Sequence, residues 1–279
     1  MPTLAPTEVL SKVRQVSQEP AIVFESVSIS FEGKQVLDGI SFLLERGETK
    51  GILGVAGSGK STILKLALGL IRPDSGRIRV LGQDVTSMSE EELFEVRRNI
   101  GMVFQESALF DSLTVRENVG FRLIEEGVPE EEITQRVQEA LRFVELEHTM
   151  DMFPAELSGG MRRRVAIARA IITRPEILLY DSPTGGLDPV TSTTIIELIL
   201  KQRDVYKTSS LLVSHRLQDA FTMATHYFDR RCNQMLPIPP GEIDVRTTFL
   251  MLRDGKVIFD GTAQELAASR DEYIREYIS

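Results

Sequence analysis

The chain has 279 residues and a mass of 31.3 kDa, which allows one large domain or two small ones. Hydrophobic residues make up 42% and charged residues 26% of the sequence, which excludes disordered, collagen-like and continuous coiled-coil proteins. The net charge of −9 does not indicate a nucleic-acid-binding surface. The one cysteine, Cys232, excludes a disulfide within the chain and a cysteine-based zinc site.

The start of the chain and its hydropathy bear on where the protein works. Residues 1–20 are rich in Ser, Thr, Gln and Pro and lack the apolar stretch of a signal peptide, and we interpret them as a tail or a short appended helix. The sequence contains no run of about 18 apolar residues, and we expect no membrane span. With the single cysteine, this favours a reducing cytosol, and any membrane role would depend on a partner.

Alternating residues predict strands near the start of the chain. Val27, Ile29 and Phe31 alternate with serines, and a second strand is expected at 40–44. The link between them is too short for a crossover helix, so these strands should be antiparallel.

From residue 51 onward, short apolar strands alternate with helical patterns, which is typical of a mostly parallel α/β sheet. Strands are predicted at 51–53, 177–180, 210–213, 248–252 and 256–259, and helices at 63–70, 131–147, 161–172, 191–202 and 264–278. The segment at about 230–246 contains three prolines and a glycine and is predicted to be an inserted loop.

The segment from Gly54 to Thr62 carries the strongest chemical signal. It matches the P-loop pattern and lies between an apolar strand and a helix. Glycines let backbone N–H groups point at phosphate oxygens, and the helix dipole adds to the attraction. We expect Lys60 to contact the β- and γ-phosphates and Ser61 to coordinate Mg²⁺. The expected nucleotide-binding residues of this loop are Gly54, Gly57, Ser58, Gly59, Lys60, Ser61 and Thr62.

Asp181 follows the apolar strand 177–180. A carboxylate at the carboxyl end of a buried strand can reach the Mg²⁺ held by a P-loop. An aspartate that ends a strand is otherwise often a turn former. Because the chain also carries a P-loop, we favour the Mg²⁺ role.

The segment from Leu157 to Ala170 indicates the class of P-loop protein. Its Leu-Ser-Gly-Gly-Met, followed by an Arg- and Ala-rich helix, resembles the signature of ABC-transporter ATPases. The resemblance runs from about residue 22 to residue 261. Within it Phe31 stands at the adenine-stacking aromatic, Gln105 at the Q-loop, Gly186–Asp188 at the end of the D-loop and His215 at the switch histidine.

This resemblance implies an α/β fold: a P-loop ABC ATPase domain over 21–262, with an antiparallel β subdomain and a helical subdomain at about 107–160. It implies that ATP and Mg²⁺ are the ligands, that Gln105 and Asp181 complete the metal site, and that His215 contacts the γ-phosphate. Residues 263–279 would form a C-terminal helix.

Ser158, Gly159 and Gly160 would begin a helix with free N–H groups, which makes a second anion site. One chain cannot aim both this site and its P-loop at the same ATP, whereas two chains packed head to tail can. We therefore expect these residues to act in trans in a homodimer. The alternative is an ordinary helix cap.

A finer resemblance covers residues 104–119, which are similar to ATPase subunits of Mla- and Mce-type lipid transporters. Met161 and the closing 275–278 fit the same subgroup. This implies a peripheral protein on the cytoplasmic face of the inner membrane, held by permease subunits. Its cargo would be phospholipid or another hydrophobic molecule exchanged with an envelope lipid-binding protein.

Other functions stay open at this point. Leu-Ser-Gly-Gly-Met also occurs in some peptide importers, so an importer of a different substrate is an alternative. A soluble ABC protein of DNA repair or translation is disfavoured, because the chain has neither a long coiled coil nor a second ATPase domain. We expect no nucleic-acid partner.

Ser182 departs from the family, which normally places Glu directly after the Mg²⁺ aspartate to polarise the attacking water. A serine hydroxyl is a poor base, and losing a general base commonly costs roughly 10²–10⁴-fold in rate. Three interpretations compete: slow hydrolysis assisted by His215, the degenerate half of a heterodimer, or an ATP-held clamp that hydrolyses almost none. An engineered substitution is a further alternative.

Other basic residues are also unexpected. Arg216 follows the switch histidine where Asp is usual, and Lys50 precedes the P-loop strand. We expect Lys50 to lie at a solvated strand edge. Residues 162–164 are three consecutive arginines, which we interpret as a solvated helix face rather than a nucleic-acid patch.

Overall fold

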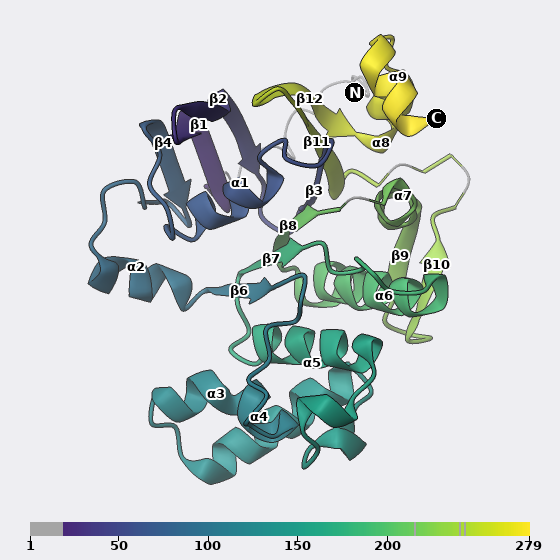
Figure 1. Ribbon diagram of the computed structural model, residues 1–279. Helices are drawn as coiled ribbons and strands as arrows, with labels where there is room; N and C mark the ends of the chain where they lie inside the picture. Colours follow the sequence, from purple (N-terminus) through teal and green to yellow (C-terminus); the bar gives the residue numbers. More distant parts are fainter. Residues whose placement is uncertain (1–18, 215, 240, 243) are drawn as a thin grey trace, which may run out of the picture.

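The computed structural model describes residues 19–214, 216–239, 241–242 and 244–279. Nearly all of the predicted tail lies outside this part of the chain. The described strands form a four-stranded sheet of order β2-β1-β4-β5, a six-stranded sheet of order β12-β11-β3-β8-β7-β6, and a hairpin of β9 and β10 (Figure 1). The α/β fold with an antiparallel sheet and a helical part is therefore confirmed.

The strands are β1 (Ile22–Phe31), β2 (Lys34–Leu44), β3 (Thr49–Leu53), β4 (Ser75–Val80), β5 (Gln83–Asp84), β6 (Ile100–Val103), β7 (Ile177–Asp181), β8 (Ser209–Val213), β9 (His226–Asp229), β10 (Gln234–Pro237), β11 (Thr247–Arg253) and β12 (Lys256–Thr262). The helices are α1 (Lys60–Ala67), α2 (Glu90–Arg97), α3 (Val115–Glu125), α4 (Glu130–Phe143), α5 (Gly159–Ile171), α6 (Pro189–Tyr206), α7 (Leu217–Thr225), α8 (Ala263–Ala267) and α9 (Glu272–Ile278), with 3₁₀ turns at Glu147–Thr149 and Pro154–Glu156.

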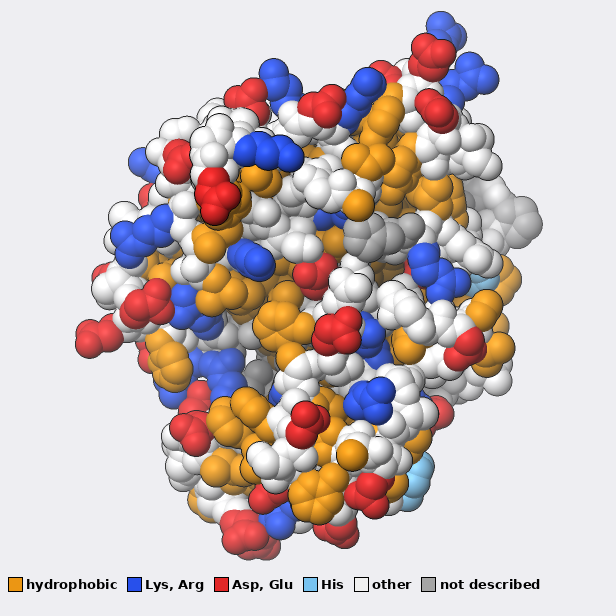
Figure 2. All heavy atoms as spheres, in the orientation of Figure 1, with side chains coloured by type: hydrophobic (Ala, Val, Ile, Leu, Met, Phe, Trp, Pro, Cys, Tyr) orange, Lys and Arg blue, Asp and Glu red, His pale blue; other side chains and the backbone are white. Residues whose placement is uncertain are grey.

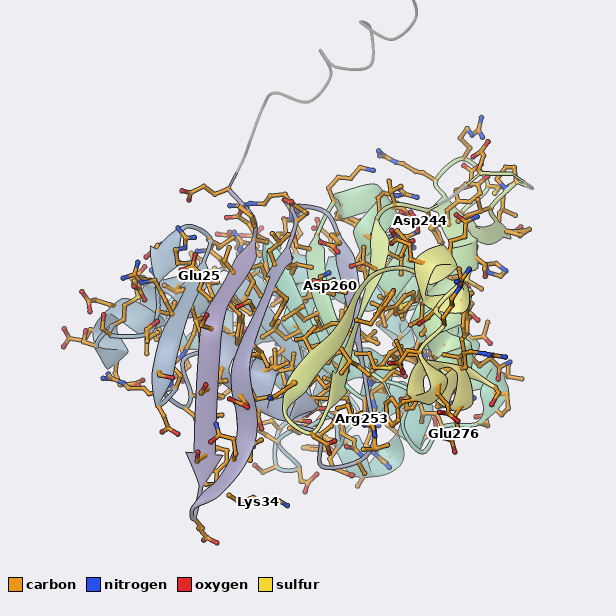
Figure 3. All side chains as sticks on the ribbon, turned by 90° about the horizontal axis from the view of Figure 1, so that it is seen from above. Glu25, Lys34, Asp244, Arg253, Asp260 and Glu276 are labelled. Carbon is orange, nitrogen blue, oxygen red and sulfur yellow. The ribbon has the colours of Figure 1, made fainter. Side chains whose placement is uncertain are left out.

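The antiparallel sheet follows from the alternation in β1. β1 pairs antiparallel with β2, as predicted, and Phe24 stacks on Phe42 with ring centroids 4.6 Å apart. β4 pairs with the other edge of β1, which the sequence pattern did not indicate. Figure 3 places Lys34 at the tip of the β1–β2 hairpin, so the exposed Phe31 lies at that end of the sheet.

The larger sheet positions the chemistry. β3 pairs in parallel with β8 and β11, and β7 pairs in parallel with β8 and β6. β3 is buried along its whole length because strands flank it on both sides. The carboxyl ends of β3, β7 and β8 therefore meet at one edge, which is where ligands bind in such sheets.

The helical part consists of α3 and α4 packed against α5 (Figure 1). The predicted apolar face of α4 is buried: Ile133, Val137 and Leu141 lie in the same cluster as residues of α5. α3 begins with a capping box in which the side chains of Thr114 and Glu117 bond each other's backbone N–H groups. The helical pattern thus predicted α4 and α5, whereas α3 was not among the predicted helices and α4 ends at Phe143, before the predicted residue 147.

The expectation for Lys50 is wrong. Its side chain is only 4% exposed, because β3 lies inside the sheet rather than at an edge. Lys50 Nζ lies 2.5 Å from Asp260 Oδ1 and 3.3 Å from Glu48 Oε1. Figure 3 labels Asp260, which lies on β12. The buried charge is tolerated because the carboxylates of Asp260 and of Glu48, which directly precedes β3, neutralise it.

The segment predicted to be an inserted loop contains β10, which forms a hairpin with β9 that packs on α6. Between β10 and β11, charged groups hold the segment. Arg203 of α6, whose side chain is fully buried, donates from Nη1 to Asp244 Oδ2 at 2.5 Å and from Nε to Asp204 Oδ1 at 2.8 Å. Arg246 also contacts Asp204, at 2.8 Å.

The C-terminal segment forms two helices rather than the one helix that periodicity predicted. The break lies at residues 268–271. Ser269 Oγ accepts from the N–H of Asp271, and Asp271 Oδ1 accepts from the N–H of Ile274, which begins a new helix. Side chains that bond nearby backbone groups compete with helix continuation.

We expect Asp244→Ala to lower the free energy of unfolding by about 3 kcal/mol, because it leaves the Arg203 guanidinium buried with a missing partner. Urea denaturation would measure this. Arg231→Ala is the matched control, since it breaks an ion pair with Asp229 in which the Arg231 side chain is 89% exposed. A loss for Asp244→Ala no larger than that of the control would contradict the anchoring role of this cluster.

Candidate functional site

The P-loop lies between β3 and α1 in a conformation that its glycines permit. Gly54 and Gly59 have φ values of +143° and +96°, which residues with a side chain rarely adopt. A Cβ at Gly54 would lie 2.6 Å from the carbonyl oxygen of Leu252, and one at Gly59 would lie 2.7 Å from Leu37 Cδ2. A Cβ at Gly57 would meet nothing within 4 Å, so the loop is open there.

Lys60 is the first residue of α1, and its side chain folds back into the loop. Its Nζ donates to the carbonyl oxygens of Gly54 at 2.8 Å and Val55 at 2.7 Å. Burial lowers the pKa of Lys60, and the negative charge of Asp181 opposes that shift. The ammonium is thus held within the loop, close to where a phosphate would lie.

Two oxygen ligands for a metal meet beside the loop. Ser61 Oγ, in the first turn of α1, donates to Asp181 Oδ1 at the end of β7 over 3.0 Å. A hydroxyl and a carboxylate are hard donors that suit Mg²⁺, which usually keeps several waters and phosphate oxygens as further ligands. The described residues contain no group of three or more His, Cys, Asp and Glu side chains that could hold a metal.

Gln105, the other predicted metal ligand, follows β6 on an exposed turn. Its Nε2 lies 3.8 Å from where a Cβ on Gly185 would be. The structure thus brings Gln105 next to the segment that follows Asp181, while Ser61 and Asp181 are in direct contact.

Ser182 is buried behind the metal pair. It has a φ of +49° and is 3% exposed, and its N–H donates to the Val213 carbonyl at 2.9 Å. Its Oγ has no hydrogen-bond partner among the described residues. Among the described residues, no side chain is therefore placed to take a proton from the Ser182 hydroxyl.

Arg163 corrects the expectation for the three arginines. Arg162 is exposed, but Arg163 is 6% exposed and points into the protein. It donates to the carbonyl oxygens of Phe104 at 3.4 Å, Ser182 at 3.2 Å and Gly185 at 3.3 Å. Burial lowers its pKa, and the negative charge of Glu106 opposes that shift.

This arginine was missed as a functional residue because its three acceptors come from segments far apart in sequence. It links the signature helix to the turn before Gln105 and to the loop after Asp181. The only signal in the sequence was its place in the apolar stripe of α5, with Val165 and Ala166 beside it in the core.

The signature residues form the beginning of α5. The Ser158 side chain accepts from the N–H of Met161 at 3.2 Å, so it caps the helix. A Cβ at Gly160 would lie 2.5 Å from Thr191 Cγ2, and the neighbour of Gly159 is Leu187. These neighbours belong to α6 and the loop before it rather than to the P-loop of the same chain.

His215 lies outside the described residues, but its neighbours are in place. Ser214 Oγ accepts from the N–H of Arg216 at 3.0 Å, and Arg216 Nη1 donates to Ser192 Oγ at 2.5 Å. The unexpected Arg216 thus ties the segment around position 215 to the start of α6.

Comparison with known proteins decides the class. A profile of the ABC transporter family matches residues 37–185, and the chain is 36% identical over 283 aligned positions to protein TRIGALACTOSYLDIACYLGLYCEROL 3, chloroplastic, of Arabidopsis thaliana (96% of this chain, 76% of that protein). The chain belongs to the ABC transporter family. It is also 36% identical over 262 residues to methionine import ATP-binding protein MetN 2 of Bacillus cereus (92% of this chain, 72% of that protein).

Solved structures agree with this assignment. The ATP-binding cassette MJ0796, in a dimeric structure bound to ADP and Pi, matches with a TM-score of 0.73 and 29% identity, over 86% of this chain and 98% of that one. The cbiO1 protein of Clostridium perfringens, part of the ABC transporter complex cbiONQ, matches with a TM-score of 0.76 and 28% identity, over 92% of this chain and 94% of that one.

This ABC protein is an ATP-binding subunit with a P-loop ATPase fold, and its ligands are ATP and Mg²⁺, as predicted. Subunits of this family dimerise and pair with permease subunits. Within the described part of the chain, no helix combines the length and the apolar character needed to cross a membrane. The narrower resemblance to Mla- and Mce-type proteins stays a prediction.

Ser61→Ala should raise the Mg²⁺ concentration needed for half-maximal binding of ATP about tenfold, because one of the paired oxygen ligands is lost. Titration of a fluorescent ATP analogue at varied Mg²⁺ would measure this. Binding of the same analogue in EDTA is the internal control and should change less than twofold. An equal loss with and without Mg²⁺ would show that Ser61 supports the loop rather than the metal.

Proposed function

We propose that this ABC protein energises the movement of phospholipid or another hydrophobic molecule through a membrane permease, and that its ATP turnover is slow. The observation that carries the ATP-dependent part is the contact between Ser61 and Asp181 beside the P-loop. The slow turnover rests on the surroundings of Ser182. The cargo rests on the resemblance of residues 104–119 to lipid-transport ATPases.

The nucleotide-binding roles that we propose rest on the P-loop geometry and on the resemblance to ABC ATPases. Lys60 supplies positive charge to the β- and γ-phosphates, and the N–H groups of the loop surround them. Ser61 and Asp181 hold Mg²⁺, with Gln105 completing the site. Phe31 stacks on the adenine and His215 contacts the γ-phosphate. The backbone N–H groups at the start of α5, with Ser158, act on the ATP of a second copy of the chain.

We expect slow turnover because the proton of the attacking water lacks a good acceptor. The water that attacks the γ-phosphate must lose a proton, and a carboxylate after Asp181 would normally accept it. Ser182 Oγ is buried, has no hydrogen-bond partner among the described residues, and is a poor base. The rate should then be roughly 10²–10⁴-fold below that with a carboxylate base. The same geometry supports the clamp and the degenerate-partner alternatives.

Ser182→Glu should raise ATP turnover of the complete transporter roughly 10²-fold or more, because it restores a proton acceptor. Phosphate release at saturating MgATP would measure this. Ser182→Gln is the matched control, since it has the same size and no basic oxygen. Lys60→Ala should abolish turnover in every background. Native turnover equal to that of Ser182→Glu would contradict the proposal and indicate another route for the proton.

Two classes of cargo compete. One relative bears the name of a galactose-containing diacylglycerol, which agrees with a lipid. Others, such as MetN of Carboxydothermus hydrogenoformans at 40% identity over 71% of this chain, are named for methionine import, which favours an importer of a small amino acid.

The cargo test uses the complex purified with its membrane subunits and reconstituted into phospholipid vesicles. We expect MgATP to drive transfer of a fluorescent phospholipid to an acceptor protein or vesicle, and no uptake of radiolabelled methionine. The complex carrying Lys60→Ala is the control for ATP dependence. Methionine uptake without phospholipid transfer would contradict the lipid assignment and support the importer. The same purification would show whether the chain is a homodimer at the inner membrane.

A further inference from the structure

The C-terminal helix α9 touches the phosphate loop. The hydroxyl of Tyr277 accepts from the N–H of Gly54 at 3.2 Å and lies 3.3 Å from the carbonyl oxygen of the same residue, to which it can donate. The two residues are 223 positions apart in the sequence. The last helix of the fold therefore bonds the first glycine of the P-loop.

Gly54 is also the anchor of the loop's lysine. Its carbonyl oxygen accepts from Lys60 Nζ at 2.8 Å, so Lys60 and Tyr277 share one acceptor. Behind Gly54, the Leu252 carbonyl would be 2.6 Å from any Cβ, which leaves its backbone no room to move in that direction. The Tyr277 hydroxyl closes a second side and thereby fixes the direction in which the Gly54 carbonyl points.

The contacts between α9 and the rest of the fold hold this hydroxyl in place. Ile274 is buried in a cluster with Leu53, the last residue of β3, and with Ala220 and Ala224 of α7. Tyr273 stacks on Tyr277 with ring centroids 6.3 Å apart, and Arg253 lies over the Tyr273 ring at 4.4 Å. In Figure 3, Arg253 at the end of β11 and Glu276 on α9 lie at the same end of the molecule.

The side of α9 that faces the fold is apolar, with Ile274 buried. In Figure 2, the outer surface where α8 and α9 lie carries both hydrophobic and charged side chains. Burial raises the pKa of the Tyr277 hydroxyl, so it stays protonated at neutral pH. It can then donate one hydrogen bond and accept another, as its position between the N–H and the carbonyl of Gly54 requires.

We propose that Tyr277 is a positioning residue of the ATP site. By fixing the Gly54 peptide, it holds the Lys60 ammonium where a β-phosphate is received. Without the hydroxyl, the Gly54 N–H loses its acceptor, and its carbonyl is left with Lys60 alone. Lys60 must then satisfy the loop and the phosphate at once, so nucleotide binds less tightly.

The test compares two identical substitutions on the same helix of the full-length chain. Tyr277→Phe removes the hydroxyl that bonds Gly54. Tyr273→Phe removes a hydroxyl that is also buried but has no hydrogen-bond partner among the described residues. Dissociation constants for a fluorescent ADP analogue and for MgATP would be measured for both, with the melting temperature of each variant without nucleotide. Neither measurement requires the protein to hydrolyse ATP.

We expect Tyr277→Phe to weaken binding of both nucleotides about three- to tenfold, which is the range for one lost hydrogen bond. Tyr273→Phe should bind them as the native chain does. The melting temperatures of the two variants should agree within about 2 °C. Unchanged affinity in Tyr277→Phe, or an equal loss of affinity in both variants, would overturn the proposal and leave Tyr277 as a packing residue.

Discussion

The structure depends on one constraint: β3, β7 and β8 run parallel, so their carboxyl ends meet at one edge of the sheet. The hydrogen bond between Ser61 and Asp181 is the direct result, because it joins the helix that follows β3 to the last residue of β7. Both residues sit on rigid elements, which fixes their separation better than loops would. A metal and a phosphate can therefore be received with little rearrangement.

Much of this could be predicted from the sequence, because the signals are local. The P-loop pattern depends on glycine conformations and a helix N-terminus, and the face of α4 that includes Val137 depends on a helical repeat. Both are encoded within about ten residues. The single predicted C-terminal helix is instead two helices, because the side chains of Ser269 and Asp271 bond nearby backbone groups. The periodicity of apolar residues carries no information about such bonds.

The buried charges could not be predicted, because their partners come from distant segments. Lys50 looked like an edge residue, yet it pairs with Asp260, which is 210 positions away. Arg163 bonds carbonyl oxygens from the segments around residues 104 and 182–185, and Arg203 bonds Asp244, which lies between β10 and β11. Each arrangement is stable only because every partner is present, so no single stretch of sequence contains the information.

The same distinction bears on our proposal that this chain binds ATP but hydrolyses it slowly. The groups that receive the nucleotide are fixed by contacts that remain complete: Lys60 and Tyr277 on Gly54, and Ser61 on Asp181. Hydrolysis needs in addition a proton acceptor, and position 182 offers a buried hydroxyl on a backbone of positive φ. Arg163 holds that backbone through its carbonyl. If turnover is as slow as we propose, the chain would bind ATP through the groups that remain complete while the chemical step is slowed.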